Sequence, residues 1–536
     1  MRTCDCCCAS SKDNHLAAPA DINDFLATLI GVERAWGLLD EAEHLAGNDA
    51  EGTRNIIDEA IVEGAASSQV LTRAARLLSA DESGAEAAHA LLERAVCLDG
   101  APAPTQLALA RSFAQCGNLS AASRWMQGAM LRARPDGALL LELATIEHQA
   151  ALLIATAARS FPCRDASLAV STGCTLLAQG HRKAARIAFD IAFAAGARFA
   201  DYLTTYSELL ADPAMHEDPP LPPGPLGMPH WWNVASMAAE ARLAAAVPAE
   251  TLVPTVASRE KSDHWIGRGE LGAFLAERIR AAEPFSWIRL NDGEARFLLH
   301  LHPDLGASVP EREASAMARL IWYVWFGQDL NDVPKASVEA LGRQFETAIA
   351  NADLLGLPSA EQLTGDKVHY GFCSGLERYM TRLFARSGPK ITTWAGFNLT
   401  LNEIDPFLSS LLNGLDFVGV ISPHPDLAGR LQRLHGIDHI RSYDIPGETR
   451  LDRPREHSDR GTHFPAIFGR IMRELEVPRR GAPFLVAGGL LGKIYCDRIR
   501  QLGGIAIDIG ALADAWMGYN SRGRVLDSAM RWQLPA

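Results

Sequence analysis

Two acidic side chains separated by one glycine follow a short apolar stretch in the second half of the sequence. The stretch is Phe285–Leu290, and Asn291, Asp292, Gly293 and Glu294 come directly after it. Two carboxylates at this spacing can converge on one hard divalent cation, Mn²⁺ or Mg²⁺, and a cation held in this way can bridge a nucleoside diphosphate. The same residues are also typical of an ordinary helix start, with an asparagine cap and acids near the positive end of the helix dipole. Both interpretations stay open at this point.

A glycine-rich turn near the end of the chain is the second candidate site. The segment Phe484–Gly510 has the order of a strand, a glycine turn, a helix and a second strand, and Asp508 is the one acid of the second strand. Gly488, Gly489 and Gly492 and the free N–H groups of the helix start would suit a diphosphate. The spacing matches neither the dinucleotide fingerprint nor the Walker loop, so a tight turn without a ligand is the other interpretation.

Strand-like and helix-like segments alternate from about residue 258 to the end of the chain, which predicts an open, Rossmann-like α/β sheet with right-handed crossovers. Helices are expected at Leu376–Arg386 and Leu427–His435. Ligands of such a sheet bind beyond the carboxyl ends of its strands. The expected strands, of which the first and the sixth should share one sheet, are Phe285–Leu290, Lys367–Cys373, Lys390–Trp394, Asp416–Ile421, His439–Tyr443, Phe484–Ala487 and Ile505–Ile509.

Together the two motifs resemble the GT-D-type glycosyltransferases. The segment Ile288–Glu294 is similar to the arginine, hydrophobic residue, glycine and Asp-Gly-Glu signature of that family. Gly488–Gly510 is similar to its final turn, helix and Ala-Ile-Asp-Ile-Gly strand, and Ile440–Pro446 to its arginine and proline segment. The resemblance covers the chain from about Gly269 to Trp516 and does not extend to the N-terminal half.

This resemblance implies metal-dependent transfer of a sugar from a nucleotide-sugar donor, a UDP-sugar, to a protein or glycan acceptor. Asp292 and Glu294 would be the catalytic pair and would hold Mn²⁺ or Mg²⁺. The chain departs from the family at Asn291, at Leu490–Gly492 and at Ala511, which leaves the donor sugar and the diphosphate contacts open. The general base is not assigned: His369, Glu377 and His463 are candidates, and each is also explained as a structural or surface residue. The residues that would bind the donor are Arg289, Gly293, Gly488, Gly489, Gly492 and Asp508.

The N-terminal half is rich in alanine and leucine and has helical periodicity with almost no strand signal. Its small and large apolar residues recur in one register, which predicts an α-solenoid of tetratricopeptide-like repeats that docks a protein or glycan acceptor or a partner, or holds copies of the chain together. The residues of this register are Ala88, Leu92 and Ala95, then Ala122, Met126 and Ala129, and then Ala185, Phe189 and Ala192.

The 536 residues therefore divide into four predicted regions: a disordered cysteine-rich tail (1–20), tetratricopeptide-like repeats (21–212), a proline-rich linker and helix (213–257) and a GT-D-type domain (258–536). The net charge of -13 argues against a nucleic-acid partner. No stretch has the character of a transmembrane span or a secretory signal, so a cytoplasmic location is expected. The alternative function is a non-catalytic repeat scaffold with a nucleotide-binding α/β remnant in glycan or glycoprotein assembly.

Overall fold

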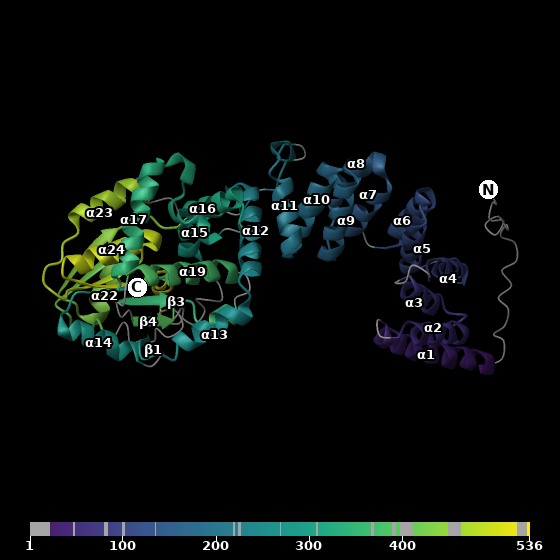
Figure 1. The fold of residues 1–536 in the computed structure, drawn as a ribbon, viewed down its shortest axis with the longest axis horizontal. Coiled ribbons are helices and arrows are strands. Elements are labelled where there is room, and N and C mark those ends of the chain that lie inside the picture. The colour runs from purple at the N-terminus through teal and green to yellow at the C-terminus, as the bar shows by residue number, and fades with distance from the viewer. Residues whose placement is uncertain are drawn as a thin grey trace. The chain divides into compact units, whose positions relative to one another are not determined.

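The computed structural model divides into two compact units, Met1–Ala197 and Arg198–Ala536 (Figure 1). The predicted cysteine-rich tail, with Cys4, Cys6, Cys7 and Cys8, lies outside the described residues. No helix in the described part of the chain is long and apolar enough to cross a membrane. The structure describes residues 22–46, 49–79, 84–98, 102–133, 136–217, 220–222, 224, 227–267, 270–306, 309–365, 369–387, 393–396, 411–448, 462–521 and 533–535.

The described part of the first unit is entirely helical, and its helices pack in successive pairs. The residues of the predicted register, from Ala88 to Ala192, are all buried, which confirms the helical repeat array. A short 3₁₀ turn, His148–Ala150, precedes the last helix of the fourth pair. The five pairs are α1 (Ile22–Leu45) with α2 (Ala50–Glu63), α3 (Ser68–Leu78) with α4 (Ala85–Leu98), α5 (Ala103–Gln115) with α6 (Leu119–Arg132), α7 (Gly137–Ile146) with α8 (Ala151–Ala158), and α9 (Ala166–Ala178) with α10 (Arg182–Ala194).

Close packing explains the alternation of small and large residues in these pairs. Gly173 on α9 faces Phe189 on α10, and a Cβ atom at Gly173 would collide with the phenylalanine ring. The turn between α5 and α6 uses Gly117 at a φ of 75°, and the Asn118 side chain then caps α6 by accepting the Ala121 N–H at 3.2 Å. The register is therefore a consequence of how closely two helices approach.

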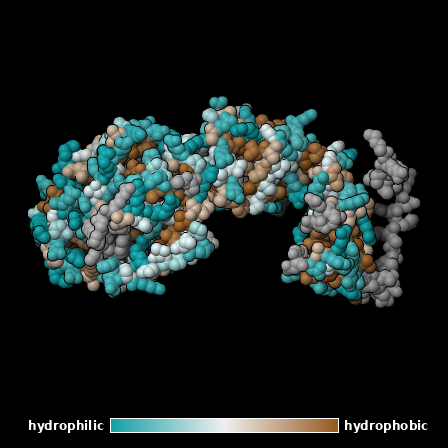
Figure 2. All heavy atoms as spheres, in the orientation of Figure 1, coloured by the Kyte–Doolittle hydropathy of each residue, from teal (hydrophilic) through white to brown (hydrophobic). Residues whose placement is uncertain are grey.

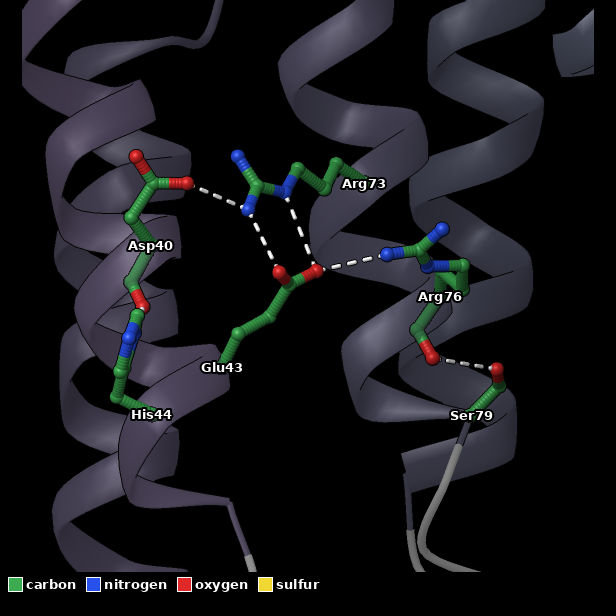
Figure 3. Close-up of polar contacts among 6 residues, drawn as sticks. All are labelled: Asp40, Glu43, His44, Arg73, Arg76 and Ser79. Atoms are coloured by element: carbon green, nitrogen blue, oxygen red, sulfur yellow. Dashed lines mark hydrogen bonds and ion pairs between the residues drawn. The ribbon is translucent and has the colours of Figure 1, made fainter. Parts of the chain in front are cut away.

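Polar side chains connect the first helices of neighbouring pairs. The Glu43 carboxylate on α1 accepts hydrogen bonds from Arg73 and Arg76 on α3, at 2.9 Å and 2.7 Å (Figure 3). Two pairs further along, the Arg111 guanidinium on α5 makes a two-pronged contact with Glu142 on α7, at 2.6 Å and 2.8 Å. Within each contact the two partners lie about one repeat apart in sequence, so these ion pairs add a polar register to the apolar one.

In the residues that the structure describes, the second unit is built on one sheet of eight parallel strands in the order β1-β4-β3-β2-β8-β7-β5-β6. Strands β2 and β7 share this sheet and are separated by β8, so the prediction that both motif-bearing strands lie in one sheet is confirmed. The strands are β1 (Trp265–Ile266), β2 (Phe285–Arg289), β3 (Leu354–Leu357), β4 (Thr393–Gly396), β5 (Phe417–Ser422), β6 (His439–Asp444), β7 (Pro483–Val486) and β8 (Ile505–Asp508).

Helices cover both faces of the sheet, and each face has its own buried cluster. Because parallel crossovers are right-handed, the direction in which the chain moves along the sheet decides which face a helix covers. One face carries α12 (His230–Ala246), α15 (Asp292–Leu301), α16 (Glu311–Phe326), α17 (Lys335–Asn351), α19 (Tyr370–Ser387), α23 (Phe468–Glu474) and α24 (Gly489–Gln501). The opposite face carries α14 (Leu271–Ala281), α22 (Leu427–His435) and α25 (Leu512–Trp516).

The described part of the second unit also contains the α-helices α11 (Ala200–Leu209), α13 (Ala249–Arg259) and α18 (Ala360–Gly365). α11 packs against α12 and so belongs to the second unit. The boundary between the two units therefore lies at Ala197–Arg198, before the proline-dense segment that starts at Pro213. The helix predicted after that segment is α12.

One predicted strand, Lys367–Cys373, is wrong in its described part, because α19 begins at Tyr370. The carboxylate of Glu240, on α12, accepts the backbone N–H groups of Gly371 and Phe372 and so caps α19 from a distant part of the chain. The strand between β2 and β4 is instead β3, a four-residue apolar run directly after α17 that was not among the predicted strands.

Candidate functional site at the carboxyl ends of the central strands

The two predicted motifs meet at the carboxyl ends of β2 and β8, which are neighbours in the middle of the sheet. After β2 the chain enters α15 on one face, whereas after β8 it enters α25 on the opposite face. Strands whose continuations diverge in this way leave a crevice at the sheet edge, and open parallel sheets bind their ligands there. We call the segments that follow β2, β7 and β8, residues 290–294, 487–489 and 509–511, the central edge.

A buried ammonium group connects the two motifs. The Lys493 Nζ atom lies 3.0 Å from Glu294 Oε1 and 3.0 Å from Asp508 Oδ2. Lys493, Glu294 and Asp508 are only 5%, 7% and 1% exposed. Burial alone would lower the pKa of Lys493, but the two carboxylates outweigh it and raise that pKa above its ordinary value. Lys493 is therefore a fixed positive charge at neutral pH.

Arg289 makes a second link between the motifs. Its backbone N–H donates to Asp508 Oδ2 at 3.2 Å, and its guanidinium lies 3.6 Å from Asp508 Oδ1. A Cβ atom on Gly510, which has a φ of 46°, would collide with this guanidinium. Arg289 and Asp508 are thus buried against each other, and their predicted contacts with a donor stay predictions.

The acidic motif itself begins α15, and its two acids have different surroundings. Glu294 Oε2 accepts the backbone N–H of Asn291 at 3.1 Å, as in a capping box. Asp292 is the more accessible acid, with 23% of its side chain exposed, and its carboxylate lies 3.3 Å from Arg296. The Arg296 guanidinium in turn stacks 4.3 Å from the ring of Phe372. The helix-start interpretation therefore describes Glu294 well, whereas Asp292 is partly exposed and pairs with Arg296.

Two glycines from the two motifs pack on one tryptophan. A Cβ atom on Gly293 would lie 3.0 Å from the Trp325 ring, and one on Gly489 would lie 3.3 Å from it. Gly489 also has a φ of 53°, which side chains other than glycine rarely adopt. Gly488 and Gly492 approach each other so closely that a Cβ on Gly488 would lie 3.1 Å from the Gly492 Cα atom. The glycines are thus required by the turn itself, with or without a ligand.

A cation held jointly by Asp292 and Glu294 does not fit these contacts. Glu294 Oε1 pairs with the ammonium group of Lys493, and Glu294 Oε2 accepts the backbone N–H of Asn291. The ammonium group therefore already lies where a metal ion bound to Glu294 would lie. Within the described ranges, no group of three or more His, Cys, Asp or Glu side chains is arranged to hold a metal ion. The Mn²⁺ or Mg²⁺ predicted at these two acids stays a prediction, and no step proposed below depends on it.

Part of the central edge is open to solvent. Its partly exposed residues are Asn291, Asp292, Gly489, Gly510 and Ala511, contributed by the ends of three adjacent strands. α24 starts at Gly489 without a side-chain cap, so the positive end of its dipole lies at this edge. A negatively charged group placed here would face backbone N–H donors.

Sequence reasoning missed Lys493 and Trp325, and it left Glu377 and His463 open as possible general bases or structural residues. Glu377 is held by Arg259 at 2.6 Å and 2.8 Å. His463 is fully buried beside Tyr495, and this burial lowers the pKa of His463 to about 3. A lysine directly after a glycine turn was the only signal for Lys493, and nothing in the spacing of Trp325 indicated its role.

Comparison with known proteins does not assign the chain to a family. No family model matches it, and no curated protein matches it. Solved structures with some likeness include YrrB, described as a TPR protein with an unusual peptide-binding site (18% identity, 35% of this chain and 92% of that chain, TM-score 0.24). Others are the APC/C hetero-tetramer Cut9-Hcn1 (16% identity, 41% and 43%, TM-score 0.28) and MamA (12% identity, 41% and 94%, TM-score 0.25).

Proposed function

We propose that the second unit is a glycosyltransferase that takes a sugar from a nucleotide-sugar, a UDP-sugar, and passes it to a protein or glycan acceptor. The observation that carries this proposal is the meeting of two segments about 200 residues apart in sequence, each of which resembles the GT-D signature, at one sheet edge. Parallel α/β sheets bind nucleotides at such an edge. A doubly wound GT-D-type fold is part of the same proposal.

The diphosphate of the donor would lie at the start of α24, at Gly489. Here the helix dipole and the backbone N–H groups of the first turn, which has no side-chain cap, favour negative charge. During transfer, an acceptor hydroxyl oxygen bonds to the anomeric carbon as the bond between that carbon and the diphosphate oxygen breaks. The electron pair of the broken bond stays on the nucleoside diphosphate, where preorganised donors stabilise the growing charge.

Asp292 is the residue we assign to the acceptor side. It is the acid of the pair with an accessible carboxylate, and it can take the proton that the acceptor hydroxyl loses. Glu294 then acts as a positioning residue, because its carboxylate fixes the start of α15 and pairs with Lys493. The metal dependence that the resemblance implies is left for the experiment to decide.

The repeat unit would dock the acceptor or a partner protein. Figure 2 shows hydrophobic residues, in brown, among the repeat helices. Aliphatic side chains that are largely exposed there include Val62, Leu131 and Leu153, on α2, α6 and α8. Repeat arrays use extended surfaces of this kind for binding.

A donor screen tests the proposal. Purified chain is incubated with a panel of nucleotide-sugars and acceptors, and nucleotide release is measured with EDTA and with added Mn²⁺. We expect release from one class of donor, and a loss of about 100- to 10,000-fold in Asp292→Asn, as for removal of a general base. Binding of UDP without release from any donor would favour the non-catalytic scaffold. No binding of any nucleotide would contradict both.

A further inference from the structure

We propose that Lys493 is the resident cation of the acidic motif, and that Glu294 and Asp508 form a latent divalent-cation site which this lysine occupies. Removal of the ammonium group should therefore create metal binding that the wild-type chain lacks. The role of this cluster in sugar transfer rests on the proposed function, but its affinity for a cation does not.

The geometry around Lys493 is that of a cation between two ligands. Its Nζ atom is equidistant, at 3.0 Å, from one oxygen of Glu294 and one of Asp508. Divalent cations contact carboxylate oxygens at about 2.0–2.6 Å. Small movements of the Glu294 and Asp508 side chains would therefore bring both oxygens within contact distance of a metal ion at the position of Nζ. The two acids come from α15 and β8, which are packed elements of the core.

The buried charges around Lys493 are balanced. Arg289, with its guanidinium 3.6 Å from Asp508, completes a buried cluster of two acids and two bases. The cluster is neutral as it stands, and adding a divalent cation would leave two uncompensated positive charges in a desolvated place. Without the lysine the cluster has one net negative charge, which attracts a cation instead.

Of the acids in the two motifs, Glu294 and Asp508 contact Lys493, whereas Asp292 contacts Arg296 instead. The Asn291 N–H, which donates to the other Glu294 oxygen, holds that carboxylate in place whether or not the lysine is present. The acid is therefore preorganised for whichever cation lies next to it.

The test uses Mn²⁺ alone, with no donor or acceptor, and measures its binding to the full chain by electron paramagnetic resonance of the free ion. Lys493→Met should bind one equivalent of Mn²⁺ on the order of 100-fold more tightly than wild type, because a nearby like charge is removed. Lys493→Arg, which keeps the charge, is the matched control and should resemble wild type. Lys493→Met combined with Glu294→Gln should lose the new site.

Two results would overturn the inference: tight Mn²⁺ binding by the wild-type chain that Glu294→Gln abolishes, or no gain of binding in Lys493→Met. If Lys493→Met does not yield folded protein, Lys493→Gln is measured in the same way and the same outcomes apply. Because no nucleotide-sugar is present, a negative result in the donor screen leaves this test unaffected. A positive result here likewise does not establish sugar transfer.

Discussion

Replacing Glu294 by glutamine should destabilise the second unit far more than replacing Asp292 by asparagine. Both changes remove one negative charge and keep the shape of the side chain. Glu294→Gln leaves the ammonium of Lys493 buried with a single carboxylate, Asp508, in place of two. Asp292→Asn removes a partly exposed charge at a helix start and its contact with Arg296.

The magnitudes follow from these surroundings. Breaking a buried ion pair by removing one partner costs about 3–5 kcal/mol, and because Asp508 still lies 3.0 Å from Nζ, we expect about 3 kcal/mol. For Asp292, the loss of a helix-dipole interaction and an i,i+4 pair amounts to roughly 1 kcal/mol at most. If the only role of the motif were to start a helix, the two variants would differ little.

Hydrogen exchange read by mass spectrometry can measure this in the intact chain, because it reports each unit separately. Amides of β2, α24 and β8 should exchange on the order of 100-fold faster in Glu294→Gln and less than about 10-fold faster in Asp292→Asn. Peptides from α1 to α10 serve as the internal control and should not change. Equal acceleration in both variants would refute the claim that Lys493 depends on Glu294.

Further predictions concern pH, the glycine turn and the repeats. Burial raises the pKa of Glu240 to about 8, so between pH 4.5 and 8 the folded chain keeps a proton that the unfolded chain has released; stability should fall as pH rises through this window, by up to about 1.4 kcal/mol per pH unit, and Glu240→Gln should remove that slope in urea unfolding. The lowered pKa of His463 has the opposite effect. As the pH falls below about 6.5 the unfolded chain binds a proton at this histidine, whereas the folded chain binds it only near pH 3, so stability should fall on acidification. A His463→Phe variant should lose less stability over this pH range. Gly489→Ala should cost about 1–2 kcal/mol through its left-handed backbone and should weaken UDP binding, whereas Gly180→Ala, at a φ of 86° in a turn of the repeats, should cost a similar amount and leave UDP binding unchanged. Deleting residues 1–197 should leave donor hydrolysis intact and abolish transfer to a macromolecular acceptor, and equal transfer by both forms would contradict the docking role.

The elements with a strong local pattern could be predicted from sequence. α22 was predicted at its observed bounds, Leu427–His435, because its apolar positions have helical spacing and Gly436 ends it at a φ of 61°. Strands β2, β5, β7 and β8 were predicted within a residue or two, since each is a short apolar run next to glycine or a charged residue.

The failures have a common cause in contacts that are distant in sequence. The segment after residue 369 is apolar enough for a strand, but Glu240 stabilises a helix start there by accepting two backbone N–H groups. The role of Lys493 depends on Glu294 and Asp508, which the fold brings to it from two other elements. The acids were correctly expected at the sheet edge, whereas the partner of Glu294 could not be read from the acidic motif alone.

The central claim is that a nucleoside diphosphate binds where the two motifs meet, and hydrogen exchange of the full chain with and without UDP tests it most directly. We predict slower exchange in three separate segments, residues 288–294, 487–493 and 508–512, and no change in α1 to α10. The same protection should be seen in the presence of EDTA, because the ammonium of Lys493 already contacts the Glu294 carboxylate. Unchanged exchange in all three segments at saturating UDP, or protection confined to another part of the chain, would contradict the account.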